Sequence, residues 1–113
     1  MPRKVSLEEA LKQIPGPKTR YWPQGEPFSD GMSHGSMSVE LFAPRGRDLQ
    51  QPHEQDELYV VMRGTAKLVH DGMETPVQSG DVLFVPSGET HKFDAMTSDF
   101  LTWVIFWGPK GGE

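Results

Sequence analysis

Short segments of β-type residues, most of them closed by a glycine or a proline, follow one another from residue 36 to residue 107. Ser36–Leu41 alternates polar and apolar residues with the two-residue period of a half-buried strand. The same reasoning predicts strands over Leu58–Arg63, Thr65–His70, Met73–Val77, Val82–Val85, His91–Phe93 and Phe100–Trp107. Asp71-Gly72 is typical of a two-residue type I′ hairpin turn. About seven short strands with regular turns predict an all-β fold, an antiparallel sandwich or barrel.

The first 35 residues lack this pattern. Ser6-Leu-Glu-Glu9 has the form of a capping box, which predicts a short N-terminal helix over about Leu7–Gln13, ended by Ile14-Pro-Gly-Pro17. Residues 19–35 are rich in Pro, Gly and Ser, and we expect most of them to form a packed arm or loop. We therefore divide the chain into a helix and arm (1–35), a β-barrel (36–107) and a C-terminal tail (108–113).

Composition excludes several classes of function. The 113 residues suffice for one domain, and the net charge of -5 provides no basic field for nucleic acid or an anionic membrane surface. No cysteine is present, which leaves histidines, carboxylates and amides as metal ligands. The first twenty residues have no apolar signal core, and no segment approaches the ~20 apolar residues of a membrane span. We expect a cytoplasmic protein.

His53 and Glu57 form the first candidate metal site, just before the apolar strand that begins at residue 58. In a straight strand their Cα atoms would lie about 13 Å apart, too far to bind one ion. A shared site therefore requires the backbone to turn within residues 54–56. The alternative is a helix, because Pro52 followed by acidic residues also fits a helix start, and His53 and Glu57 would then be a solvated pair on one helix face.

A second alternative is that Glu57 forms an ordinary ion pair with Arg63 or Lys67 and no metal binds. A metal would need a third ligand, and His91 is the best placed histidine, because it follows the rigid turn of residues 86–90 at the start of a strand. The other two histidines are expected at the surface, as is usual for polar residues near turns: His34 and His70.

Two stretches resemble the conserved motifs of the cupin family. Gly80-Asp-Val-Leu-Phe-Val-Pro86-Ser-Gly88-Glu-Thr-His91 resembles the second motif, in which Gly, Pro, Gly and His recur at this spacing. Gln51-Pro-His53-Glu-Gln-Asp-Glu57, followed six residues later by Gly64, resembles the first motif, with its two histidines, glutamate and closing glycine. The resemblance covers about residues 36–107. It implies a double-stranded β-helix, a jelly-roll-like barrel that is usually dimeric and carries a metal in its mouth.

Carried over by position, the resemblance implies that His53, Glu57 and His91 bind the metal. Gln51 stands where the family has its first histidine, and an amide oxygen is a poorer ligand than imidazole for Zn, Fe or Ni. Gln51 is therefore expected as a weaker fourth ligand or as a hydrogen-bond partner beside the metal.

Tyr59 and Phe93 have the same strand parity as Glu57 and His91, so we expect them to line the pocket or to belong to the plain core. Two imidazoles and one carboxylate leave open positions on Fe, Mn, Ni or Zn. The resemblance therefore implies a metal-dependent enzyme acting on a small organic substrate, either a dioxygenase or an isomerase or lyase. The alternative is a non-catalytic small-molecule-binding or sensor module. The expected partners are a small molecule and a second copy of the chain.

Overall fold

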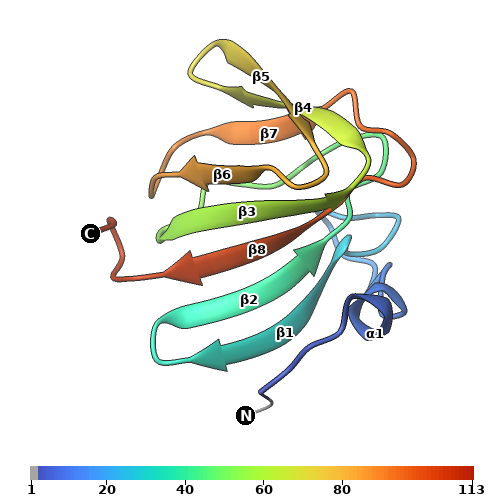
Figure 1. The fold of residues 1–113 in the computed structure, drawn as a ribbon, viewed down its shortest axis with the longest axis horizontal. Helices are drawn as coiled ribbons and strands as arrows, with labels where there is room; N and C mark the ends of the chain where they lie inside the picture. The colour runs from blue at the N-terminus through green and yellow to red at the C-terminus, as the bar shows by residue number, and fades with distance from the viewer. Residues whose placement is uncertain (1–2) are drawn as a thin grey trace.

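The computed structural model describes residues 3–113, so the first two residues of the predicted arm lie outside the described part. In this range the chain forms one helix and eight strands (Figure 1). Their bounds are α1 Leu7–Leu11, β1 Phe28–His34, β2 Met37–Phe42, β3 Asp56–Arg63, β4 Thr65–His70, β5 Met73–Gln78, β6 Val82–Val85, β7 His91–Asp94 and β8 Leu101–Trp107.

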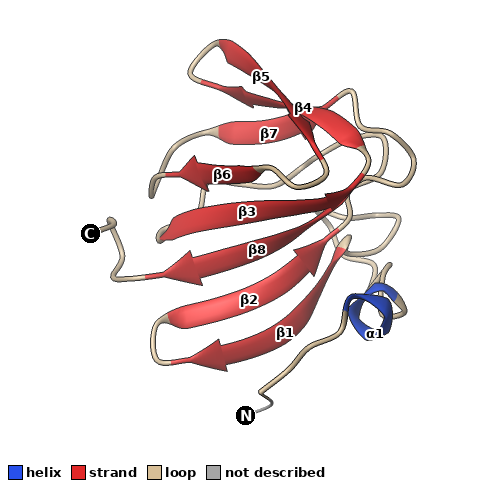
Figure 2. Cartoon of the chain, in the orientation of Figure 1, coloured by secondary structure: helices blue, strands red, loops and turns tan. Residues whose placement is uncertain are grey.

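The strands form two antiparallel sheets, one of five strands in the order β1-β2-β8-β3-β6 and one of three in the order β5-β4-β7. Strands dominate the chain in Figure 2, and the predicted all-β class is confirmed. The connection from β3 to β4 links the two sheets. Each of the seven predicted strands is present, with ends shifted by no more than two residues.

Residues 19–27 form no helix or strand, as expected of an arm or loop, but Phe28–His34 is strand β1, which the sequence did not predict. A register shift between Asp30 and Met32 breaks the pairing of β1 with β2 and with it the two-residue period. The strand also pairs on one side only, so it needs no continuous apolar face. The five-stranded sheet therefore starts at residue 28, eight residues before the expected start of the barrel.

Helix α1 begins where the capping pattern predicts. The Ser6 hydroxyl oxygen accepts a hydrogen bond from the Glu9 backbone N–H at 3.1 Å. The helix ends at Leu11, two residues earlier than expected, since Pro15 disfavours helical geometry at Ile14. It lies beside β1 and β2 in Figure 1. No helix within residues 3–113 is long and apolar enough to cross a membrane.

The two faces of the five-stranded sheet pack against different partners. The inner face, toward the three-stranded sheet, contributes Tyr59, Val61 and Val104 to a core shared with Phe93 and Phe100. The outer face carries a smaller cluster beneath α1, formed by buried and half-buried apolar residues: Ala10, Leu41, Leu101 and Trp103 among them.

Positive φ angles mark two structurally important turns. Asp71 and Gly72 have φ values of 46° and 71°, as the predicted type I′ turn requires. Gly64, between β3 and β4, has φ 75°, and a Cβ added there would lie 2.8 Å from the Phe100 Cα. Only glycine fits this link between the sheets without displacing backbone.

Candidate functional site

A cavity of about 250 Å³ opens on the inner face of the five-stranded sheet. Its apolar part is formed by four aromatic rings and Val104, the rings being Trp22, Phe28, Phe42 and Phe106. Its polar part is formed by six side chains that can form hydrogen bonds: Glu40, Gln50, Gln51, His53, Glu57 and Tyr59. A cavity of this size suits one small organic molecule.

Glu57 and His91 form a buried pair at the polar end of this cavity. Glu57 is the second residue of β3 and His91 is the first of β7, so one residue comes from each sheet. Glu57 Oε1 lies 2.6 Å from His91 Nε2, and the two side chains are 2% and 1% exposed. The surface alternative for Glu57 is wrong, because Arg63 pairs with Glu8 at 2.6 Å and Lys67 pairs with Glu74 at 3.4 Å.

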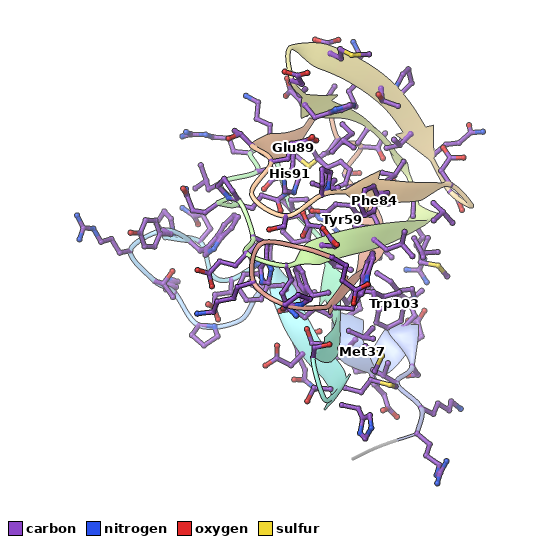
Figure 3. The ribbon with its side chains drawn as sticks, turned by 90° about the vertical axis from the view of Figure 1, so that its left-hand side faces the viewer. Met37, Tyr59, Phe84, Glu89, His91 and Trp103 are labelled. Atoms are coloured by element: carbon purple, nitrogen blue, oxygen red, sulfur yellow. The ribbon has the colours of Figure 1, made fainter. Side chains whose placement is uncertain are left out.

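The hydrogen bonds around the pair favour a protonated His91 ring. The Gln50 amide Nε2 donates to the Asp48 carboxylate, so Gln50 Oε1 is the acceptor for the Tyr59 hydroxyl at 3.0 Å. The Tyr59 oxygen also lies 3.0 Å from His91 Nε2 and 3.4 Å from Glu57 Oε1. His91 Nδ1 donates to the Glu89 carbonyl oxygen at 2.8 Å. Nδ1 therefore carries hydrogen, and Nε2 faces the Glu57 carboxyl and the Tyr59 oxygen, an arrangement that favours the imidazolium form of His91. Tyr59, His91 and Glu89 lie close together in Figure 3.

The pKa directions agree with this network. Burial alone would lower the pKa of His91, but the hydrogen bonds to Glu57 and to the Glu89 carbonyl outweigh it, and the pKa is raised. Burial, together with the negative charges of Glu57 and Asp48, raises the pKa of Tyr59 well above its ordinary value. Tyr59 therefore stays neutral and acts as a hydrogen-bonding group.

His53 lies in the loop before β3, at the bend that the sequence required. The chain bends at residues 54 and 55 and becomes extended at Asp56, so the helix alternative is wrong. The His53 ring stacks on Phe106 with centroids 3.8 Å apart, and its Nδ1 accepts the Gln55 backbone N–H at 3.2 Å. The Gly88 N–H donates to the His53 carbonyl at 2.8 Å, which ties this loop to the turn before β7.

Of the three expected metal ligands, Glu57 and His91 are in contact, whereas His53 lines the same cavity as Glu57 without joining the pair. Within residues 3–113, no three His, Asp or Glu side chains surround one point as a metal site would. Glu57 and His91 suit a divalent cation, which would replace the Nε2 proton, and the Glu89 carbonyl already orients the imidazole through Nδ1. His53 accepts at Nδ1, so its hydrogen is on Nε2, and it fits a metal only after leaving the Gln55 N–H.

The other expected site residues have different environments. Tyr59 lines the cavity and is fully buried. Phe93 packs in the core against Tyr59 and Phe100, each with ring centroids 4.9 Å away. Gln51 lies at the cavity rim, exposed, with its amide 3.5 Å from the Leu49 carbonyl.

Three polar residues near the cavity escaped the sequence analysis. Asp48 and Gln50 lie in a loop with no strand pattern, so nothing in their spacing marks them; Asp48 also accepts the Phe93 N–H at 2.8 Å. Glu40 was part of the recognised alternation of β2. The alternation did not indicate which side of β2 faces the cavity. In the structure the side that carries Glu40 faces it.

The cupin domain model matches residues 38–107, so the chain belongs to the cupin family. An uncharacterized protein of Streptomyces coelicolor is 39% identical over 77 residues, which are 66% of this chain and 73% of that protein. Two solved structures have the same fold as this chain. A Cupin 2 conserved barrel domain protein of Salinispora arenicola has a TM-score of 0.67 at 21% identity, covering 96% of this chain and 89% of that one. The DMSP lyase of Ruegeria pomeroyi has a TM-score of 0.60 at 20% identity, covering 72% and 46%.

Proposed function

We propose that this protein is a metal-dependent enzyme acting on a small organic substrate in the 250 Å³ cavity. The supporting observation is the Glu57–His91 pair, a carboxylate and an imidazole 2.6 Å apart at the polar end of that cavity. Membership of a family that includes enzymes is consistent with this proposal. The charged pair is buried beside a space large enough for a ligand, which is unusual for a purely structural ion pair.

We assign His53, Glu57 and His91 as the ligands of one divalent ion, Fe, Mn, Ni or Zn. His53 would give up its 3.2 Å hydrogen bond from Gln55, a weak bond at that length. The ion would supply polarisation of a substrate oxygen and hold the substrate through open positions. Gln51, at the rim, would be a fourth ligand or a hydrogen-bond partner of whatever the ion holds.

The chain's own residues position the reacting groups and exclude water. Asp48, Gln50 and Tyr59 form a chain of hydrogen bonds that fixes the His91 ring from one side, and the Glu89 carbonyl fixes it from the other. The aromatic part of the cavity favours a substrate with an apolar portion and strengthens electrostatic interactions at the polar end. The reaction would be either dioxygenation or an isomerase or lyase reaction. A sensor module that only binds a small molecule is the alternative.

Elemental analysis of protein purified without a metal-affinity tag tests the proposal. We expect about one divalent ion per chain in the wild type. The ion should be lost in His91→Ala and in Glu57→Ala and retained in His34→Ala, which removes an exposed histidine from β1. Circular dichroism would show whether each variant is folded. A folded wild type that binds no metal after dialysis against each of the four ions would contradict the proposal and favour the sensor alternative.

We also propose that a second copy of the chain covers the outer face of the five-stranded sheet. Val82 and Phe84 on β6 are 60% and 57% exposed there, and Phe84 lies against Trp107. Light scattering should give the mass of a dimer for the wild type and of a monomer for Phe84→Glu. A wild-type monomer at micromolar concentration would contradict this assignment.

A further inference from the structure

We propose that Glu40 is the acid–base residue of the cavity, which removes a proton from the carbon next to a carbonyl of a small enolisable substrate and exchanges it with solvent through Asp30. This inference rests on the proposed function and deepens it. It selects proton-transfer chemistry, of the isomerase or lyase kind, over dioxygenation. Glu40 lies outside both motifs that carry the family resemblance.

The strand register places Glu40 across the cavity from the network around His91. Glu40 on β2 pairs with Val104 on β8, and Val104 pairs in turn with Tyr59 on β3. The Glu40 and Tyr59 backbones are therefore two strand spacings apart, about 10 Å. The residue between them is a small valine. A small molecule bound over Val104 would thus have Tyr59 and Glu57 on one side and the Glu40 carboxyl on the other.

Glu40 also has a route to water. Its cross-strand partner on the other side is Asp30, which is exposed, and the two carboxyls share a hydrogen bond. Both residues line a groove that adjoins the cavity, together with His53 and Phe106. Within residues 3–113, no Lys or Arg forms an ion pair with Glu40. The carboxyl is therefore free to gain and lose a proton rather than being held as a carboxylate.

The surroundings bring the pKa of Glu40 close to neutral pH. Burial, followed by the charge and hydrogen bond of Asp30, raises the pKa of Glu40 from 4.5 to about 7. The other groups around it are Glu57 on β3 and Glu26 before β1, both of which raise this pKa further, and His53 in the loop before β3. Strand β8 presents Val104 and Phe106 and no titratable group. An acid–base group works best when its pKa is near the working pH.

The proposed step balances without an oxidant. The Glu40 carboxylate forms an O–H bond with the proton of the C–H group next to the carbonyl. The C–H electron pair becomes a C=C bond, and the carbonyl electron pair moves onto oxygen to give an enolate. If the carbon that lost the proton carries a hydroxyl, the hydroxyl proton passes to the enolate oxygen and Glu40 returns its proton to the former carbonyl carbon, which gives the isomer. Alternatively, the enolate regains its carbonyl by expelling a leaving group, with its bonding electron pair, from the β-carbon, and the Glu40 proton passes to that leaving group.

Hydrogen–deuterium exchange tests this step. Metal-loaded wild type is incubated in D2O with pyruvate, hydroxyacetone and dihydroxyacetone, and the loss of C–H signals is followed by proton NMR. We expect catalysed exchange with at least one probe, reduced at least 100-fold in Glu40→Gln and partly restored in Glu40→Asp. Glu74→Gln, the matched control, removes an exposed carboxylate on β5 that pairs with Lys67 and should exchange at the wild-type rate. Asp30→Asn should shift the pH profile of exchange to lower pH, because it removes a neighbouring negative charge.

A second readout needs no metal and no substrate. In the metal-free protein with ¹³C-labelled glutamate, one carboxyl should titrate near pH 7, and this signal should be absent from Glu40→Gln. If exchange is absent with all three probes, or is equal in wild type and Glu40→Gln, Glu40 is not the acid–base residue.

The metal content of the same samples distinguishes failure of the Glu40 proposal from failure of the proposed function. A metal-loaded wild type without exchange overturns the role of Glu40 alone. A protein that binds no metal overturns the proposed function, and the titration then decides whether Glu40 carries an exchangeable proton.

Discussion

The two sides of the cavity hold their acidic groups in opposite ways. On the β3 and β7 side, Glu57 faces the His91 cation at 2.6 Å, and every neighbouring polar group has a hydrogen-bond partner. On the β2 side, Glu40 has a second acid, Asp30, as its cross-strand and hydrogen-bond partner and, in the part of the chain that the structure describes, no Lys or Arg in an ion pair with it. Acid–base sites often contain two such carboxyls, one that stays charged and one that gains and loses a proton. The experiments below test whether the two carboxyls really differ in this way.

Glu57→Ala should give the largest effect, because it leaves the His91 ring buried without its partner. Removing one member of a buried pair costs about 3 kcal/mol or more of unfolding free energy. Urea denaturation at pH 6 would measure it. Glu74→Ala breaks the exposed pair with Lys67, whose side chains are 59% and 50% exposed, and should change stability by less than about 1 kcal/mol. Equal effects in the two variants would show that the Glu57–His91 pair contributes no more than a surface pair.

Glu40→Gln should stabilise the protein at high pH. The folded pKa of Glu40 is about 7 and the ordinary value is 4.5, so the folded state binds a proton more tightly than the unfolded state does. Wild-type stability therefore falls as pH rises from 4.5 through 7 and is then constant. The glutamine variant lacks this loss. It should be more stable than wild type by about 1 to 3 kcal/mol at pH 8 and similar at pH 4. Thermal unfolding at pH 4, 6 and 8 measures this, and a pH-independent difference would contradict it.

Tyr59→Phe should have a smaller effect on stability. It deletes a hydroxyl that bonds both Gln50 and His91 at 3.0 Å and leaves their buried polar atoms one partner short. We expect a loss of about 1 to 2 kcal/mol. Tyr21→Phe is the matched control, because Tyr21 is 62% exposed, and it should unfold like the wild type. If the two variants behave alike in chemical denaturation, the network does not stabilise the fold.

The smallest contrast is between two neighbouring glutamines. Gln50 holds Asp48 and Tyr59 together, so Gln50→Ala should cost about 1 kcal/mol. Gln51 is exposed at the rim and makes only a 3.5 Å contact, so Gln51→Ala should stay within about 0.5 kcal/mol of the wild type. The midpoints of urea unfolding, measured side by side, would reveal whether the order is reversed.

Much of the fold was predictable because strand signals are local. The alternation of Ser36–Leu41 and the turn residues Asp71-Gly72 and Gly64 depend on nearby residues, and each predicted strand is present. Strand β1 was not predictable, since its register shift and its edge position remove the periodic signal. The family resemblance supplied the pairing of Glu57 with His91, which lie 34 residues apart in the chain.

The rest of the site depends on contacts that sequence patterns do not carry. Whether His53 presents a free nitrogen is decided by the Gln55 N–H and the Phe106 ring, not by motif spacing. The inward direction of Glu40 was hidden because the outer face of β2 is also covered, by α1 over Leu41. An alternating strand with apolar neighbours on both sides gives no clue to which side meets the cavity.

The Gly64 link between β3 and β4 leaves no room for a side chain. The β3–β4 connection passes so close to Phe100 that even one added carbon would meet the Phe100 backbone at 2.8 Å. Any side chain here must therefore displace the Phe100 backbone or distort the turn that carries the chain from one sheet to the other.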